Sequence, residues 1–531
     1  MKKKFVLPLF FYALCLSISA QEIEYSKPVN DPESCTSIMV GKKASADGSV
    51  ITSHTCDGNY RTWMELVPAK QYDKDTIVSI YDGLMHTESI EDKSKWIQKG
   101  TIPQVKSTYR FLNTSYPCFN EKQLGIGETT ITGRKELVNK NGMFMIEELQ
   151  RLALERCTTA RDAIRLMGEL IEKYGYADSG ECLTIADKKE VWHFEVFGEG
   201  PDKIGGVWAA MRIPDDHVGV SANIPRISTI DKNDTENCMF STNVFDVAKK
   251  LGYWDGKETF CFWKAYGGVK KAFNIREFFI LNYLAPSLNL SYEAEELPFS
   301  VKPENPVAAT DVMALLRQTY EGTQWDMTQN LKVEVKNRET EKMDTIVSPM
   351  ANPWMTMDEV NMFNAIKDST VVRYRLVSVP QCSYSVVIQL RDWLPDAIGG
   401  ITWLSFDNPG QSPRIPIFCG STDLPECFDI CGQHRYREDA AVWKFRRANK
   451  LATVRWGLTK DKMNGSIAHF EEKAQMELPF IESQYTKILN AQGEKAANNY
   501  LTGYTKDFAG ATILRWDEMA DEFWKMFARG F

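Results

Sequence analysis

The sequence predicts an α+β protein, because segments with strand periodicity and segments with helix periodicity both occur along its 531 residues. Apolar and polar residues alternate at 36–40 and at 192–196, which is typical of β-strands. Apolar residues recur every three or four positions between 145 and 173, in two stripes that predict adjacent helices. The same helical spacing returns beyond 436, so a helical region is expected to close the chain.

Residues 35–57 predict a β-hairpin that begins at a cysteine. Asp47-Gly48 is a strong turn signal, because glycine adopts positive φ without steric cost. The β-branched residues at 50–52 then supply the return strand. This hairpin is the part of the chain around which we expect the functional residues to gather.

The pairing of the hairpin decides which side chains meet. If Val40 pairs with Val50, His54 and Asp57 lie at the same end of the hairpin as Cys35. A thiol, an imidazole and a carboxylate would then be close together. A slip of one residue would turn the faces over, because side chains alternate across a strand.

Cys35 has a special chemistry if it becomes the first residue of a mature chain. Its own α-amine, with an unperturbed pKa of about 7.7–8.0, would then lie beside its thiol and could act as general base. The alternative interpretation is an ordinary buried cysteine in a strand, which is the usual environment of a free cysteine.

The residues before Cys35 favour the first interpretation. Residues 1–20 have a basic start, an apolar run and small residues at the end, which is typical of a secretory signal peptide. Residues 21–34 are polar and contain two prolines, so they are expected to form a propeptide or linker. The protein is therefore expected to be secreted or periplasmic, without membrane insertion after the signal peptide is removed.

The hairpin resembles the opening of a known family. Cys35-Thr36-Ser37, the run Ala44-Ser45-Ala46-Asp47-Gly48-Ser49 and the later Asp57 resemble the start of the dipeptidase family that includes the secernins. These are N-terminal nucleophile cysteine hydrolases, distantly related to bile-salt hydrolase and penicillin V acylase. The resemblance implies a four-layer αββα sandwich as catalytic domain at 35–435, with the helical region at 436–531 packed on it.

The resemblance also implies roles for individual residues. Asp57 matches the acid that orients the amine of the nucleophile, and Asn223 matches a side-chain amide that stabilises the oxyanion. His54 stands where the acylases have an arginine, so its catalytic role is left open. An asparagine in a turn is the alternative interpretation of Asn223.

A second family-like run covers 119–130 and places Glu128 and Thr129 beside the nucleophile as substrate-binding residues. A surface carboxylate is the alternative for Glu128. The acylases have a further active-site arginine, and three residues of this chain are open candidates for it: Arg373, Arg375 and Arg391.

The composition excludes several classes of function. A net charge of −8 argues against nucleic acid and against acidic membranes as partners.

Of the 12 cysteines, Cys15 lies in the predicted signal peptide, and the remaining odd number of cysteines leaves at least one unpaired thiol. The late group Cys419, Cys427, Cys431 and His434 has a weak zinc-site spacing, and a disulfide or simple packing is favoured.

Together these observations predict an exported cysteine dipeptidase that hydrolyses unblocked dipeptides through a Cys35 thioester. Small peptides are the expected partners, and a homo-oligomer is compatible with the sequence. No metal and no organic cofactor are expected. Two alternatives stay open: an amidase that acts on acylated amines, as the bile-salt and penicillin enzymes do, and a secreted binding protein without activity.

Overall fold

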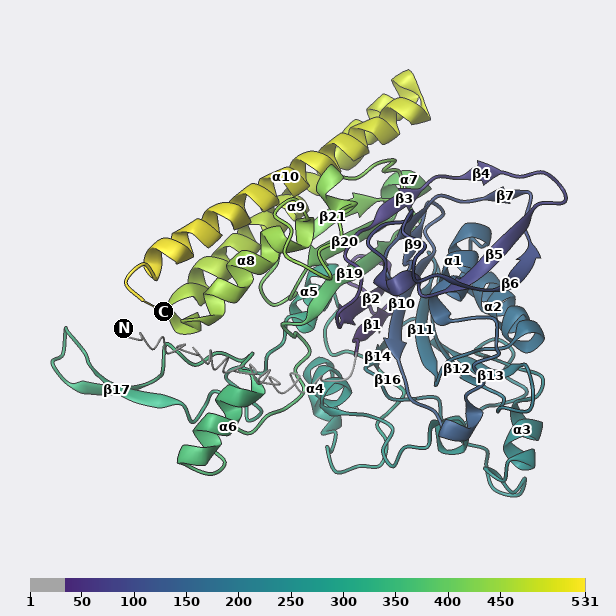
Figure 1. Cartoon of the computed structure of the whole chain (residues 1–531), viewed down its shortest axis with the longest axis horizontal. Coiled ribbons are helices and arrows are strands. Elements are labelled where there is room, and N and C mark those ends of the chain that lie inside the picture. The colour runs from purple at the N-terminus through teal and green to yellow at the C-terminus, as the bar shows by residue number, and fades with distance from the viewer. Residues whose placement is uncertain (1–33, 531) are drawn as a thin grey trace, which may run out of the picture.

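The computed structural model describes residues 34–530, which form an α+β sandwich of two antiparallel sheets between helices (Figure 1). The predicted signal peptide at 1–20 lies outside the described residues, as does the predicted propeptide or linker up to residue 33. Among the described residues, no helix is long and apolar enough to cross a membrane. The predicted fold class is confirmed.

The first sheet has seven strands and contains the hairpin that follows Cys35. Its spatial order is β16 (Ser300–Val301), β14 (Val218–Ser221), β1 (Ser37–Val40), β2 (Val50–Asp57), β19 (Cys382–Leu390), β20 (Ile401–Phe406) and β21 (Ile415–Phe418). The strands β1 and β2 therefore lie at its centre, and they are fully buried.

The second sheet has eight strands and lies against the first. Its spatial order is β15 (Cys238–Phe240), β13 (Gly206–Ile213), β12 (Val191–Gly198), β11 (Glu181–Ala186), β10 (Gly125–Thr130), β9 (Phe119–Asn120), β8 (Phe111–Asn113) and β3 (Glu65–Val67). Three two-stranded ribbons complete the strands of the described chain: β4 (Lys70–Gln71) with β7 (Ser107–Thr108), β5 (Ile77–Asp82) with β6 (Ile97–Pro103), and β17 (Lys332–Lys336) with β18 (Met343–Val347).

Helices cover the outer faces of both sheets (Figure 1). The second sheet is covered by α1 (Ile146–Arg156), α2 (Ala160–Tyr174) and α3 (Val244–Lys250). The first sheet is contacted by α4 (Ile275–Leu284), α5 (Ala309–Leu316), α7 (Asp396–Gly399), α8 (Ala441–Thr453) and α10 (Glu494–Met526). The remaining α-helices of the described chain are α6 (Met357–Ile366) and α9 (Trp456–Gln492), of which α9 packs against α8 and α10.

The predicted pair of helices at 145–173 is confirmed by α1 and α2. The hydroxyl of Thr159 accepts a hydrogen bond from the backbone N–H of Asp162 and caps α2. Gly175 has a φ of 85° and ends the helix, since glycine adopts this conformation without a Cβ clash. The C-terminal helices pack on the sandwich, where the hydroxyl of Thr505 donates to the backbone oxygen of Pro416 at 2.9 Å.

The predicted register of the hairpin was wrong by one residue. Val40 pairs with Ile51 instead of Val50, and Ser34 forms a bridge with Asp57. The Asp47-Gly48 turn does not set the register alone, because the backbone of the loop 41–49 is bonded to distant segments. Cys35 and His54 therefore face the same side of the hairpin, while Asp57 faces the other.

One glycine lets the two sheets approach closely beside the hairpin. A Cβ on Gly127 of β10 would lie 2.2 Å from the backbone oxygen of Ser53 in β2. Only glycine allows this approach. It brings the next residue, Glu128, to the end of the hairpin where Cys35 lies.

Candidate active site

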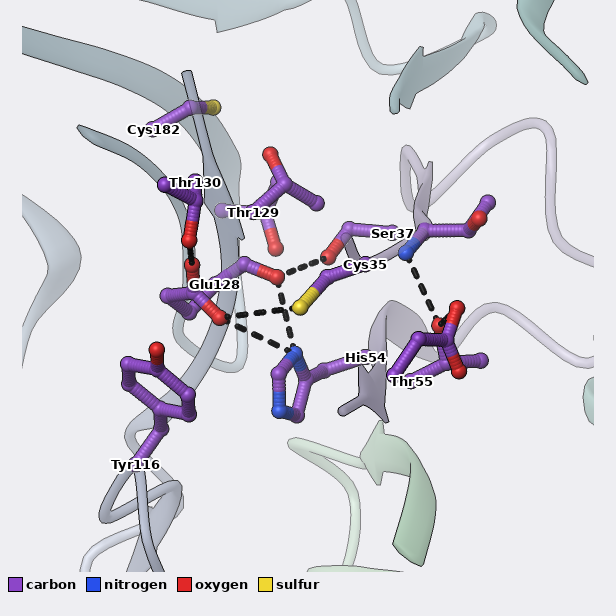
Figure 2. Close-up of polar contacts among 12 residues, drawn as sticks. Cys35, Ser37, His54, Thr55, Tyr116, Glu128, Thr129, Thr130 and Cys182 are labelled. Atoms are coloured by element: carbon purple, nitrogen blue, oxygen red, sulfur yellow. Dashed lines mark hydrogen bonds and ion pairs between the residues drawn. The ribbon is translucent and has the colours of Figure 1, made fainter. Parts of the chain in front are cut away.

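Cys35 lies just before β1 and is completely buried. Its thiol donates a hydrogen bond to Oε2 of Glu128 at 3.3 Å (Figure 2), and its backbone N–H donates to Oδ1 of Asn223 at 2.9 Å. Burial raises the pKa of the Cys35 thiol well above its usual value, and the neighbouring Glu128 carboxylate adds to the rise. The thiol is therefore protonated at neutral pH and would need a base to become a nucleophile.

Glu128 is also completely buried, so it is not the surface carboxylate that was the alternative interpretation. Its Oε1 accepts a hydrogen bond from the hydroxyl of Thr130 at 3.1 Å. Burial raises the pKa of Glu128, while a hydrogen bond from Glu181 partly opposes the rise. Thr129 lies next to it, but its hydroxyl is bonded to that of Ser221 at 2.6 Å.

His54 lies on the same side of the hairpin as Cys35 and approaches Glu128 (Figure 2). Its Nδ1 is 2.8 Å from the backbone oxygen of Glu128, so Nδ1 carries a proton and donates it there. Burial lowers the pKa of His54 to about 4. The imidazole is therefore neutral at neutral pH and cannot supply the positive charge of the arginine that the acylases have at this place.

The thiol of Cys35, a ring nitrogen of His54 and a carboxylate oxygen of Glu128 lie within 4.8 Å of one another. These three atom types are ones that Zn²⁺ accepts as ligands, so this cluster is the place in the described chain where a metal ion would fit. The hydrogen bond from Nδ1 to the backbone of Glu128 competes with such a role.

The orientation of the Asn223 amide is determined by its partners. Oδ1 accepts from the backbone N–H of Cys35 and from Arg276 Nη2 at 2.8 Å, both of which are donors. Nδ2 donates to the backbone oxygen of Thr130 at 2.7 Å. The side-chain oxygen, and not the amide N–H, is therefore directed at Cys35.

Arg276 is a site residue that the sequence analysis missed. It is buried, and its Nη1 donates to the backbone oxygen of Cys35 at 2.7 Å. The residue lies in the first turn of α4, which begins with a capping box formed by Asn274 and Glu277. That Asn-x-x-Glu spacing before an apolar run is the signal that could have placed Arg276 at the start of a helix.

Asp57 is bound on the opposite side of the hairpin from the thiol. Its Oδ2 accepts from Arg375 Nη2 at 2.9 Å and from the hydroxyl of Thr55 at 2.9 Å. Arg375 Nε also donates to the hydroxyl of Ser34 at 3.1 Å. Of the three candidate arginines, Arg375 thus reaches residues beside Cys35, whereas Arg391 donates to the backbone oxygens of 398 and 399.

The late cysteines do not form a metal site within the described residues. The thiol of Cys419 donates to the backbone oxygen of Asn120 at 3.2 Å, and a ring nitrogen of His434 lies 3.0 Å from the backbone oxygen of His86. All cysteines from Cys35 onward are free thiols, which supports packing over a disulfide for this group.

The fold and the site define a class of protein. Cys35 is buried at the start of a central strand in an αββα sandwich. Its backbone nitrogen contacts the amide of Asn223 and its sulfur contacts the carboxylate of Glu128, which is the arrangement of a cysteine hydrolase. The model of Peptidase family C69 matches residues 34–473, and the chain belongs to this family. It is therefore a peptidase, and the family resemblance drawn from the sequence is confirmed.

Several curated proteins are similar over most of the chain. A probable dipeptidase from Latilactobacillus sakei is 27% identical over 417 residues, covering 74% of this chain and 76% of that protein. A probable dipeptidase from Salmonella dublin is 26% identical, with 73% and 81% covered. Dipeptidase A from Lactobacillus helveticus is 21% identical, with 89% and 92% covered.

Proposed function

We propose that the protein is an exported cysteine dipeptidase in which Cys35 becomes an N-terminal nucleophile. The observation that carries the proposal is the double contact of Cys35, whose nitrogen meets Asn223 and whose sulfur meets Glu128. Both atoms that an N-terminal nucleophile uses therefore have a polar partner within hydrogen-bond distance. The names of the similar proteins support dipeptides as substrates.

The proposed reaction begins when the freed α-amine of Cys35 takes the proton of the thiol. The sulfur attacks the carbonyl carbon of the peptide bond, and the resulting ammonium gives its proton to the leaving amine as the C–N bond breaks. Water then hydrolyses the thioester and regenerates the thiol. The amine takes the place of the backbone N–H that donates to Asn223 Oδ1 in the unprocessed chain, so Asn223 would keep it in position.

Glu128 is proposed to recognise the substrate's α-amine. A cationic ammonium that enters a buried site needs an acidic partner to offset its lost hydration. Glu128 is a buried carboxylate in contact with the nucleophile, and so it lies where the residue carrying the amine would bind. Acylated substrates carry no such charge, and an enzyme built for them is expected to place apolar side chains there.

The mature chain is expected to begin at Cys35, because the α-amine acts as base only after the Ser34–Cys35 bond is cut. N-terminal sequencing or mass spectrometry of exported protein should give Cys-Thr-Ser-Ile as the first residues. A fully active protein that still begins at Gln21 would refute the amine-as-base mechanism.

The change Glu128→Gln is expected to lower kcat/KM for unblocked dipeptides by about 10- to 100-fold, the usual effect of losing a hydrogen bond between two charged groups. Turnover should be compared on Ala-Ala, N-acetyl-Ala-Ala, a glycine-conjugated bile acid and penicillin V. Glu121→Gln is the matched control, because Glu121 lies on the same segment but pairs with Arg110. An equal loss on all substrates would mean that Glu128 supports the thiol rather than the substrate amine, and faster turnover of the acylated compounds by the wild type would favour the amidase alternative.

A further inference from the structure

A cavity lies outside the candidate active site. It has a volume of about 520 Å³ and is lined by residues of β3, β5, β8 and α1. Its lining includes neither Cys35 nor Glu128. This volume is in the range of cavities that bind small organic molecules. We refer to it as the Arg61 pocket, after the buried arginine in its wall.

Most charges in the wall of the Arg61 pocket are already paired. Arg151 donates to Glu148 at 2.6 Å and to Glu155 at 3.0 Å, which forms a network along α1. Glu65 accepts a hydrogen bond from the side-chain amide of Asn113 at 3.0 Å. The remaining buried ionisable groups are a guanidinium and a carboxyl group, those of Arg61 and Glu147.

Arg61 is held in place by one edge of its guanidinium group. Its Nη2 donates to Oδ1 of Asn113 at 2.7 Å, and the group lies over the ring of Trp63 at 3.6 Å. The residue is only 2% exposed, and yet Nε and Nη1 have no hydrogen-bond partner among the described residues. Buried donors of a charged group are costly to leave unpaired, so these two N–H groups point to a ligand that accepts.

Glu147 presents the complementary case. It is 3% exposed, and neither of its carboxylate oxygens has a hydrogen-bond partner within the described part of the chain. Burial raises the pKa of Glu147 to about 8. Arg61 and Glu147 influence each other electrostatically but form no direct ion pair in the described structure, and both residues line the same cavity.

We propose that the Arg61 pocket binds a small zwitterion, either a free amino acid or a dipeptide. The ligand carboxylate accepts from Nε and Nη1 of Arg61, and the ligand ammonium donates to Glu147. Val67, Ile77 and Phe111 line the same cavity and supply an apolar surface for the ligand's side chain. This site is separate from the nucleophile and does not require the proposed hydrolytic activity.

A chain of side-chain contacts connects the Arg61 pocket with the surroundings of Cys35. Tyr60, the neighbour of Arg61 in the chain, lies near the hydroxyl of Tyr116 at 3.3 Å, and the Tyr116 ring contacts His54 with a centroid distance of 5.6 Å. The substrate or product of a dipeptidase would thus bind within a few side chains of the thiol.

The test uses the full-length chain with Cys35→Ala, so that dipeptides bind without being cleaved. Calorimetric titration with leucine and with Leu-Leu distinguishes the amino acid from the dipeptide, and binding of either one supports the proposal. Leucinamide lacks the carboxylate and N-acetyl-leucine lacks the ammonium. Each is expected to bind at least about tenfold more weakly than leucine, because each loses a charge-assisted hydrogen bond.

Side-chain variants then assign each charge to its partner. Arg61→Gln should weaken leucine binding at least about tenfold but leave the binding of leucinamide unchanged. Glu147→Gln should also weaken leucine binding at least about tenfold, but it should leave the binding of N-acetyl-leucine unchanged. Lys70→Gln is the matched control, because Lys70 lines the cavity but is exposed, and it should change nothing. If Arg61→Gln does not fold, the ligand series on the parent chain carries the test.

Two results would overturn the proposal. One is equal affinity for leucine, leucinamide and N-acetyl-leucine, or no binding of either leucine or Leu-Leu. The other is binding that Glu128→Gln abolishes and Arg61→Gln does not, which would place the ligand at the nucleophile. Neither result bears on dipeptide turnover by the wild type, which is measured separately.

Discussion

Replacing Cys35 with alanine is expected to abolish peptide hydrolysis, with kcat reduced by about 10⁴-fold or more, as for other nucleophile knockouts. The sulfur that forms the proposed thioester is lost, while the small side chain still fits the buried position at the start of β1. Dipeptide turnover and the mass of the N-terminus are measured together. If the cut before Cys35 is intramolecular, this variant also keeps the preceding residues.

Cys427→Ala is the matched control for this prediction. Cys427 is a free thiol that is only partly buried, and it lies in the segment after β21. Its variant should hydrolyse dipeptides and be processed like the wild type. Wild-type turnover by Cys35→Ala would show that Cys35 is a packing residue and that another group performs the chemistry.

The second large effect is expected at Asn223, where Asn223→Ala should lower kcat by about 10²–10³-fold. The orientation of the amide makes a further distinction possible. Asn223→Asp keeps an oxygen for the nitrogen of Cys35 and for Arg276 but loses the Nδ2 donor. If Asn223 acts by holding the amine, Asn223→Asp should stay within about tenfold of the wild type.

The role expected from the sequence, a donor to the oxyanion, makes the opposite prediction. In that case Asn223→Asp loses as much kcat as Asn223→Ala, because the amide N–H is absent from both. Asn223 has a φ of 67°, so alanine also strains the backbone there. Asn223→Gly removes the side chain without that strain and should match Asn223→Ala. Wild-type kcat in all three variants would show that Asn223 only forms the turn and has no role in catalysis.

The local elements could be predicted because their signals lie within a few residues of one another. Thr159 and Gly175 mark the ends of α2, and the alternation at 192–196 predicts part of β12. Glu128 and Asn223 were found for a different reason, since the sequence around each one resembles a family motif. Their placement within hydrogen-bond distance of Cys35 then follows from the fold.

Contacts between distant segments could not be predicted in the same way. Arg276 is separated from Cys35 by 241 residues, and nothing in its own neighbourhood indicates which backbone oxygen its guanidinium will meet. Arg375 could not be distinguished from Arg373 and Arg391, because all three lie near strand-forming residues. The contact of Arg375 with Asp57 depends on the pairing of β19 with β2, because this pairing brings the segment that precedes β19 next to Asp57.

The sequence by itself determined the class of fold and the family, because hydrophobic periodicity and the motif at Cys35 are local properties. Only the tertiary structure decided which of those groups meet. A shift of one residue in the pairing of β1 with β2 put His54 on the side of Cys35 and Asp57 on the other. That shift depends on the loop 41–49, whose backbone bonds to residues 215, 217 and 307. Such long-range backbone hydrogen bonds determine the strand register more strongly than the Asp-Gly turn does.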